Sequence, residues 1–125
     1  MDLDMKVLVV DDIETTRRNL KSILRRIGFT NITEADDGST ALAALKKDKV
    51  DLIISDWNMP KVTGLELLKA VRSNESTKDT PFLMVAGDVQ KENVVQAFQA
   101  GVSNFIVKPF SPEAIKKKLE QLFKA

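Results

Sequence analysis

Acidic side chains and one lysine stand at the ends of short apolar runs in this sequence. Asp11 and Asp12 come directly after one such run, Asp56 ends another, and Lys108 follows a third. Clustered carboxylates without histidine or cysteine suit a hard cation with oxygen ligands, above all Mg²⁺. Because Mg²⁺ takes only one or two carboxylates, a remaining carboxylate can act as a nucleophile while a lysine holds a phosphoryl oxygen. The residue set therefore predicts phosphoryl transfer to an aspartate.

The composition excludes several other classes of function. The chain has 125 residues, 43% of them hydrophobic and 30% charged, as expected of one soluble globular domain. It contains no cysteine and no histidine, which excludes disulfides, zinc–thiolate sites and a serine–histidine nucleophile. The net charge of +1 gives no reason to expect a nucleic-acid or membrane partner. No segment resembles an export signal or a membrane span, so we expect a cytoplasmic protein.

Apolar runs and amphipathic stretches alternate along the chain. Strands are expected at residues 5–10, 31–35, 50–55, 81–86 and 105–107. Helices are expected after each of them, marked by apolar positions within residues 20–27, 41–45, 65–71, 94–98 and 115–122. Five alternations with nearly continuous apolar strands predict the α/β class, with a parallel sheet that helices cover on both faces.

The last two helices carry more specific expectations. Val94, Val95 and Phe98 recur at helical spacing and are expected to face inward on the fourth helix. Ser111 and Pro112 supply an N-cap and a proline at the first position of the last helix. Each helix is therefore expected to pack on the sheet through one apolar stripe.

The carboxyl ends of the strands are where ligands bind in an open parallel sheet. The third expected strand is followed by Asp56, Trp57 and Asn58, and the fourth ends in Ala86, Gly87 and Asp88. A single aspartate at such a position most often caps a turn or a helix. An acid pair, a third acid and a lysine after alternate strands are a rarer combination. We therefore expect the three carboxylates and the lysine to converge on one edge of the sheet.

Three segments carry a resemblance to a known family. They are Val9-Val10-Asp11-Asp12, Asp56-Trp57-Asn58-Met59-Pro60 with Gly64, and Lys108-Pro109-Phe110. Together they resemble the receiver domains of two-component response regulators, and the second segment with Lys91-Glu92-Asn93 is most similar to single-domain chemotaxis regulators. The resemblance covers residues 5–123 and implies a single receiver domain over residues 1–125. The implied fold is flavodoxin-like, a doubly wound (βα)5 unit with strand order 2-1-3-4-5.

The resemblance implies a role for each residue of the acidic site. Asp56 is the implied phosphoacceptor and also contributes to the Mg²⁺ site. Asp12 is expected to bind Mg²⁺ directly and Asp11 largely through a bound water, while Asn58 offers its main-chain carbonyl. Lys108 is expected to contact the phosphoryl group.

Neighbouring residues are implied to assist this chemistry. The main-chain amide of Gly87 and the residue Asn58 are expected to help bind the phosphoryl group. Asp88 and Trp57 are expected to modulate the site. The Lys108–Pro109 peptide bond is expected to be cis.

The sequence departs from the family's pattern at two switch positions. In this family, phosphorylation repositions a hydroxyl residue after the fourth strand and an aromatic residue on the fifth. Here the first of these positions is Ala86 and the second is Phe105. A hydrogen bond to a charged group contributes about 1.5–3 kcal/mol, as much as a typical allosteric coupling of about 1–3 kcal/mol. We therefore expect Ala86 to weaken the output without preventing phosphorylation.

The resemblance also implies partners. A histidine kinase is the implied phosphate source. Since the chain has no histidine of its own, the phosphate is expected from a small phosphodonor or from a phosphohistidine in another protein. The expected output is protein contact through residues 91–101, 105 and 112–123, with a downstream protein such as a flagellar motor switch component. We expect a monomer that catalyses only its own phosphotransfer and autodephosphorylation. The retained alternative is a phosphorylation-insensitive binding module, or a phosphate sink, on the same scaffold.

One side of the first helix is strongly basic. It carries Arg17, Arg18, Lys21, Arg25 and Arg26. Such a surface could dock an acidic partner such as a histidine kinase domain, whereas solubility is the simpler explanation.

Overall fold

The structure is a computed structural model that describes residues 2–87 and 90–124. Its strands are β1 (Lys6–Val10), β2 (Asn31–Ala35), β3 (Leu52–Asp56), β4 (Phe82–Ala86) and β5 (Asn104–Val107). Its helices are α1 (Glu14–Ile27), α2 (Gly38–Lys47), α3 (Gly64–Ser73), α4 (Lys91–Gln99) and α5 (Pro112–Leu122). The predicted alternation of strands and helices is confirmed.

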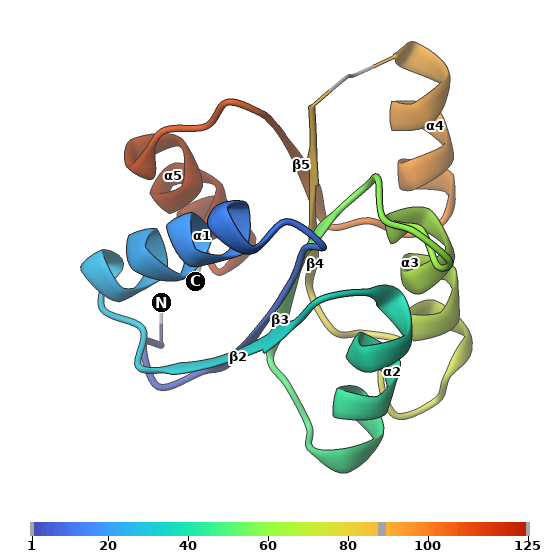
Figure 1. Cartoon of the computed structure of the whole chain (residues 1–125), viewed down its shortest axis with the longest axis horizontal. Coiled ribbons are helices and arrows are strands. Elements are labelled where there is room, and N and C mark those ends of the chain that lie inside the picture. Colours follow the sequence, from blue (N-terminus) through green and yellow to red (C-terminus); the bar gives the residue numbers. More distant parts are fainter. Residues whose placement is uncertain (1, 88–89, 125) are drawn as a thin grey trace.

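The sheet is parallel, with strand order β2-β1-β3-β4-β5. Helices α1 and α5 cover one face, and α2, α3 and α4 cover the other (Figure 1). Both the predicted class and the strand order implied by the resemblance are confirmed. Because all strands run the same way, their carboxyl ends meet at one edge, and Asp56 is level with Val85 there.

The core consists of two apolar layers that the sheet separates. Val7 and Val9 of β1 pack toward α1 and α5, whereas Leu8 and Val10 pack toward the other helices. Every residue of β3 and β4 is buried. Burial on both faces explains why these strands read as continuous apolar runs and not as alternating ones.

Side-chain caps begin three of the helices. Asp37 accepts a hydrogen bond from the Thr40 amide, and Thr63 accepts one from the Glu66 amide, so both form capping boxes. Ser111 accepts a hydrogen bond from the Ala114 amide, with proline in the first turn that follows, as predicted. Because each helix follows a parallel strand, these capped helices begin near the edge where the strands end.

Helix α4 departs from the expected packing. Ala97 is buried and Val94 is partly buried, but Val95 and Phe98 are 44% and 52% exposed. The prediction that all three large residues face inward was therefore wrong for Val95 and Phe98. Helix α4 lies at the end of its layer and contacts α3 on one side, so a narrow stripe of the helix suffices to cover the sheet (Figure 1).

Within the described part of the chain, no helix combines the length and the hydropathy that crossing a membrane requires. Asp88 lies outside the described residues.

Candidate functional site

Three carboxylates meet at the carboxyl edge of the sheet. Asp11 and Asp12 follow β1, and Asp56 is the last residue of β3. One carboxylate oxygen of each lies within 4.8 Å of the others. Asp11 and Asp56 are buried, while Asp12 is exposed to solvent. The predicted convergence is confirmed, and one member of the cluster is open to an incoming group.

The Asp11 carboxylate is only partly satisfied by the protein. Its Oδ1 accepts a hydrogen bond of 2.9 Å from the Ile13 amide. Its Oδ2 is buried and has no hydrogen-bond partner among the described residues, and the Lys108 ammonium is 3.6 Å away. A buried carboxylate oxygen without a partner is costly. Together with three carboxylates at one place, this oxygen fits a hard divalent cation such as Mg²⁺.

The Asp56 carboxylate is 5% exposed at the residue level and faces Lys108. Its Oδ1 lies 3.2 Å from the Lys108 Nζ and accepts a 2.9 Å hydrogen bond from the Trp57 amide. Burial raises the pKa of the Asp56 carboxyl above its usual value, and the charge of Asp11 raises that pKa further, while Lys108 partly offsets both effects. Asp56 is therefore a desolvated carboxylate beside a fixed cation.

Lys108 reaches the site because it directly follows β5, whose carboxyl end lies at the same edge of the sheet. Its amide donates a 2.8 Å hydrogen bond to the Ala86 carbonyl, which continues the pairing of β4 with β5 by one residue. The peptide bond between Lys108 and Pro109 is cis, as predicted. The lysine is thus held by main-chain bonding on the opposite side of Asp56 from β1.

Gly64 brings the loop after β3 close to Asp56. Its amide donates a 2.9 Å hydrogen bond to the Trp57 carbonyl. A Cβ at position 64 would stand 2.2 Å from the Asp56 carbonyl oxygen and 2.9 Å from the Trp57 Cα. Since both neighbours are backbone atoms, only glycine fits here without a backbone shift. Gly64, which the sequence analysis singled out together with the segment from Asp56 to Pro60, is therefore required for a steric reason.

Arg17 supports the site in a way that sequence reasoning missed. Its guanidinium donates a 2.7 Å hydrogen bond to the Asp11 main-chain carbonyl and a 3.1 Å hydrogen bond to Glu34 on β2. Lys21 also binds Glu34, at 3.0 Å, and is the main reason that the pKa of the Glu34 carboxyl is lowered. No local pattern signals the bonds to Glu34, because β2 and α1 come together only in the folded chain.

Trp57, Asn58 and Gly87 surround the acidic cluster. Trp57 is half-buried beside the core, whereas Asn58 and Gly87 are exposed at the loops after β3 and β4. A Cβ at Gly87 would meet no atom within 4 Å, so this stretch of backbone is open. The structure therefore brings these sequence-predicted residues to the same edge as the carboxylates.

Ala86 and Phe105 lie beneath that edge in one apolar layer. They are 2% and 9% exposed and belong to the same core cluster. The rings of Phe105 and Trp57 are 6.4 Å apart between centroids, at an interplanar angle of 52°. This separation is within the range of favourable aromatic pairs. The Phe105 side chain is therefore turned inward, next to an alanine that has no polar side-chain atom.

Comparisons with known proteins agree with this geometry. The chain matches the family described as the response regulator receiver domain over residues 7–120. It is 48% identical to the chemotaxis protein CheY of Pseudomonas aeruginosa over 119 residues, which are 95% of this chain and 96% of that protein. It is 46% identical to CheY-3 of Vibrio cholerae over 123 residues, which are 98% of this chain and 95% of that protein.

Solved structures give the same result. The chemotaxis protein CheY4 of Vibrio cholerae superposes with a TM-score of 0.90 at 38% identity, covering 96% of this chain and 99% of that one. A response regulator receiver protein of Pseudomonas putida superposes with a TM-score of 0.87 at 28% identity, covering 97% and 99%. The acidic cluster, the lysine beside Asp56 and these matches lead to one conclusion: the chain belongs to the response regulator receiver family and is homologous to CheY.

Proposed function

We propose that this protein is a Mg²⁺-dependent receiver that accepts a phosphoryl group on Asp56 and passes the signal on by protein contact. The observation that carries the proposal is the cluster of three carboxylate oxygens within 4.8 Å, with Lys108 3.2 Å from Asp56. The complete set of ionic groups does not favour a phosphorylation-insensitive binding module or a phosphate sink. The whole chain, residues 1–125, acts as one receiver domain with its core at residues 5–123.

The reaction is an in-line displacement at phosphorus. An Asp56 carboxylate oxygen forms a bond to phosphorus while the donor's bond to phosphorus breaks, and the donor atom leaves with the electron pair and takes up a proton. The Oδ1 of Asp56 is held by Trp57 and Lys108, which leaves Oδ2 to react. The product is an acyl phosphate, whose later hydrolysis by water returns Asp56 to a carboxylate.

The surrounding groups neutralise and position the phosphoryl oxygens. Asp12, Asp11 and the main-chain carbonyl of Asn58 hold the Mg²⁺, with Asp56 itself as a further ligand. When bound, this ion supplies charge neutralisation for the phosphoryl oxygens. Lys108 binds a phosphoryl oxygen as a point charge. The Gly87 amide and Asn58 provide further contacts, and Trp57 and Asp88 modulate access to the site.

The partners follow from the family. Receivers homologous to CheY are signalling proteins and not conventional enzymes, so this chain catalyses only its own phosphotransfer and autodephosphorylation. The phosphate comes from a histidine kinase in the cytoplasm. The output surface is the face of α4, β5 and α5, where Val95, Phe98 and Val107 are exposed apolar residues. A monomer that contacts a flagellar motor switch component fits the chemotaxis relatives.

The relay from Asp56 to that surface is proposed to be weak. Ala86 has no hydroxyl to bond the phosphoryl group, a contact worth about 1.5–3 kcal/mol. The Phe105 ring is already buried against Trp57 in the unphosphorylated protein, so phosphorylation is not needed to bury it. A comparison of partner affinity with and without beryllofluoride, a stable phosphoryl mimic, tests this. We expect a gain below about fivefold, and a gain of tens of fold would contradict a weak relay.

Labelling with acetyl phosphate tests the phosphoacceptor itself. We expect incorporation that requires Mg²⁺ and is lost in Asp56→Asn, because an amide is not a nucleophile for phosphorus. Asp4→Asn, at an exposed position far from the site, serves as the matched control and should keep full incorporation. Incorporation that survives in Asp56→Asn, or that needs no divalent ion, would contradict the proposal.

A further inference from the structure

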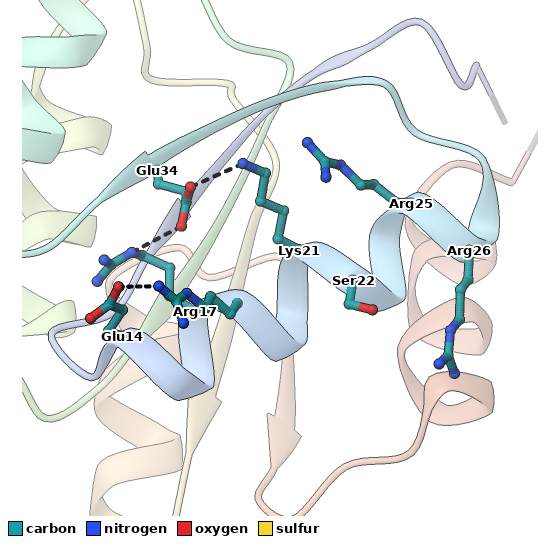
Figure 2. A pocket seen from close by; sticks show the side chains of 8 residues that line it. Glu14, Arg17, Lys21, Ser22, Arg25, Arg26 and Glu34 are labelled. Atoms are coloured by element: carbon teal, nitrogen blue, oxygen red, sulfur yellow. Dashed lines mark hydrogen bonds and ion pairs between the residues drawn. The ribbon is translucent and has the colours of Figure 1, made fainter.

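Arg72, near the end of α3, is a partly buried cation that the phosphoacceptor chemistry does not use. Burial lowers the pKa of the Arg72 guanidinium below its usual value, and the charge of Asp79 offsets this only in part. Among the described residues, no carboxylate lies within salt-bridge distance of Arg72. Figure 2 shows the opposite case, Arg25 and Arg26, which extend from α1 at the surface. A partly buried guanidinium without a carboxylate needs other acceptors.

Main-chain carbonyls and one hydroxyl are the acceptors that hold this guanidinium. The Nη1 of Arg72 donates hydrogen bonds of 3.1 Å and 2.6 Å to the carbonyls of Lys78 and Thr80, in the loop before β4. Its Nε donates a 2.9 Å hydrogen bond to the Gly101 carbonyl, between α4 and β5, and its Nη2 lies 3.5 Å from the Ser103 Oγ. The side chain therefore joins α3 to the start of β4 and to the start of β5.

The turn that ends α4 packs directly on the Arg72 side chain. Gly101 has a φ of +95°, and a Cβ at this position would stand 3.2 Å from the Arg72 Nε. The Gly101 amide donates a 3.1 Å hydrogen bond to the Phe98 carbonyl. The Val102 amide donates a 3.0 Å hydrogen bond to the Ala97 carbonyl. The arginine thus binds and covers a helix end whose amides close back onto α4.

The two ends of α4 are held differently. At the amino end, the N-cap residue Gln90 makes no side-chain cap hydrogen bond. At the carboxyl end, Arg72 binds the turn, and Ser103 continues it into the sheet. The Ser103 amide donates a 3.0 Å hydrogen bond to the Phe82 carbonyl, and the Ser103 Oγ accepts one of 2.9 Å from the Phe82 amide. The position of α4 relative to β5 therefore depends on the end where Arg72 lies.

We propose that Arg72 is a positioning residue of the output surface, which fixes the carboxyl end of α4 against α3 and the sheet through the Gly101 carbonyl. A guanidinium suits this role because its planar fork donates to several acceptors at once, whereas a lysine ammonium binds as a point charge. Without this donor the carbonyls of the turn lose a partner, and the turn gains freedom. The inference rests on the proposed function only in treating this face as the output surface.

Amide hydrogen exchange of the full-length protein, without any phosphodonor, tests the proposal. In Arg72→Met, exchange at the Gly101 and Val102 amides should become at least about tenfold faster. The amides of Gly28 and Phe29 are the internal comparison, since they close the end of α1 around another glycine with positive φ. Their exchange should stay the same, because α1 and α3 cover opposite faces of the sheet (Figure 1).

Two further substitutions separate a local anchor from a general loss of stability. Arg72→Lys keeps the charge but loses the planar fork, so it should give the same selective acceleration to a smaller extent. Lys69→Met removes an exposed cation from the same helix and should leave all the exchange rates unchanged. Equal acceleration at the ends of α1 and α4 in Arg72→Met would overturn the proposal, as would rates at Gly101 and Val102 that do not change.

A spin label examines the same anchor from the output surface. The chain has no cysteine, so Phe98→Cys, at a half-exposed position of α4, offers a single site for a nitroxide. Its spectrum should show greater mobility in Arg72→Met, whereas a label at the exposed Ser22→Cys on α1 should not change. An unaltered spectrum at Phe98→Cys would contradict the positioning role. Acetyl phosphate labelling should be equal in Arg72→Met and the natural sequence. A natural protein that incorporates no phosphate would contradict the proposed function and not the anchor.

Discussion

The phosphoacceptor site and the relay pair Ala86–Phe105 lie side by side at the carboxyl edge of the sheet, yet they are built differently. The first contains two buried carboxylates, Asp11 and Asp56, which the protein satisfies only in part: Lys108 and the Trp57 amide bind Asp56, whereas Asp11 Oδ2 has no hydrogen-bond partner among the described residues. The second is an apolar contact of Phe105 with Trp57 above a small alanine, and it is already satisfied. The comparison shows that the charged groups and the proposed relay consist of different atoms of the same edge.

The contrast has an energetic basis. The acidic cluster has unfavourable burial and repulsion that Lys108 offsets only in part, so ligands act on it strongly. The relay pair already has its dispersion contacts and its area burial without any bound group. A charged site that a bound cation would stabilise therefore lies beside an apolar contact that is complete without one.

Gly64→Ala should have the largest effect, because it disturbs the backbone that holds Asp56 in the phosphoacceptor site. The new Cβ would stand 2.2 Å from the Asp56 carbonyl oxygen, so backbone must move. We expect a loss of about 2–4 kcal/mol in the free energy of unfolding, measured with urea, and a loss of labelling at Asp56. Gly87→Ala is the matched control at an open position and should cost less than about 1 kcal/mol. An unchanged midpoint in Gly64→Ala would contradict the steric account.

Ala86→Thr tests whether the missing hydroxyl at position 86 is what weakens the proposed relay. A hydroxyl at this position would supply the missing hydrogen bond to the phosphoryl group, worth about 1.5–3 kcal/mol, or roughly tenfold to a hundredfold in coupling. Partner affinity with beryllofluoride should then rise well above that of the natural sequence, while labelling at Asp56 stays the same. Ala86→Val, which adds volume without a hydroxyl, is the control. If it raises the coupling equally, packing and not hydrogen bonding is the cause.

Asp56→Asn should stabilise the Mg²⁺-free protein at neutral pH, by about 1 kcal/mol. The folded pKa of Asp56 is raised, so its favourable contribution exists below the unfolded pKa of 3.8 and is lost as the pH rises through the folded pKa. The stabilisation by asparagine should therefore be close to zero near pH 3 and grow above pH 4. Urea unfolding across this pH range measures it. A variant that is less stable than the natural protein at pH 7 would contradict the electrostatic description.

Arg17→Ala should have the smallest effect of these changes. It removes the 2.7 Å hydrogen bond to the Asp11 carbonyl, so the loop that holds the metal ligands loses one support. We expect Mg²⁺ affinity, followed by Trp57 fluorescence, to fall about twofold to fivefold, which corresponds to about 0.5–1 kcal/mol. Arg25→Ala, in the same helix without such a bond, should leave the affinity unchanged. A Trp57 signal that does not respond to Mg²⁺ in the natural protein would count against the metal site itself.

Much of the fold and of the acidic site could be predicted because their signals are local. The apolar runs placed the strands to within about two residues, and Asn31–Ala35 was placed at its observed bounds. The Ser111 cap is a property of neighbouring residues and was predicted as it occurs. That Asp11, Asp12 and Asp56 lie at one edge follows from parallel strands, whereas their closeness also requires β1 and β3 to be neighbours in the sheet. The strand order came from the resemblance and not from any local pattern.

Other features could not be predicted because they depend on neighbours that are distant in the sequence. The exposure of Val95 and Phe98 depends on where α4 lies in its layer, since a periodic apolar pattern does not tell how wide the covered stripe is. The bond of Arg17 to Glu34 requires β2 to lie near the start of α1. Asp11 was predicted as a site residue and Arg17 as part of a basic helix side, but the two were not predicted as partners.

The sequence by itself determined the chemical inventory of this protein: three carboxylates and a lysine after alternate strands, and an alanine at the end of the fourth strand. The tertiary structure alone decided which of these groups are satisfied. It left Asp11 Oδ2 buried without a hydrogen-bond partner among the described residues, while Phe105 packs on Trp57. The physical reason is that residue type and spacing determine which interactions are possible, whereas burial and distance, which only the fold creates, determine which of them form.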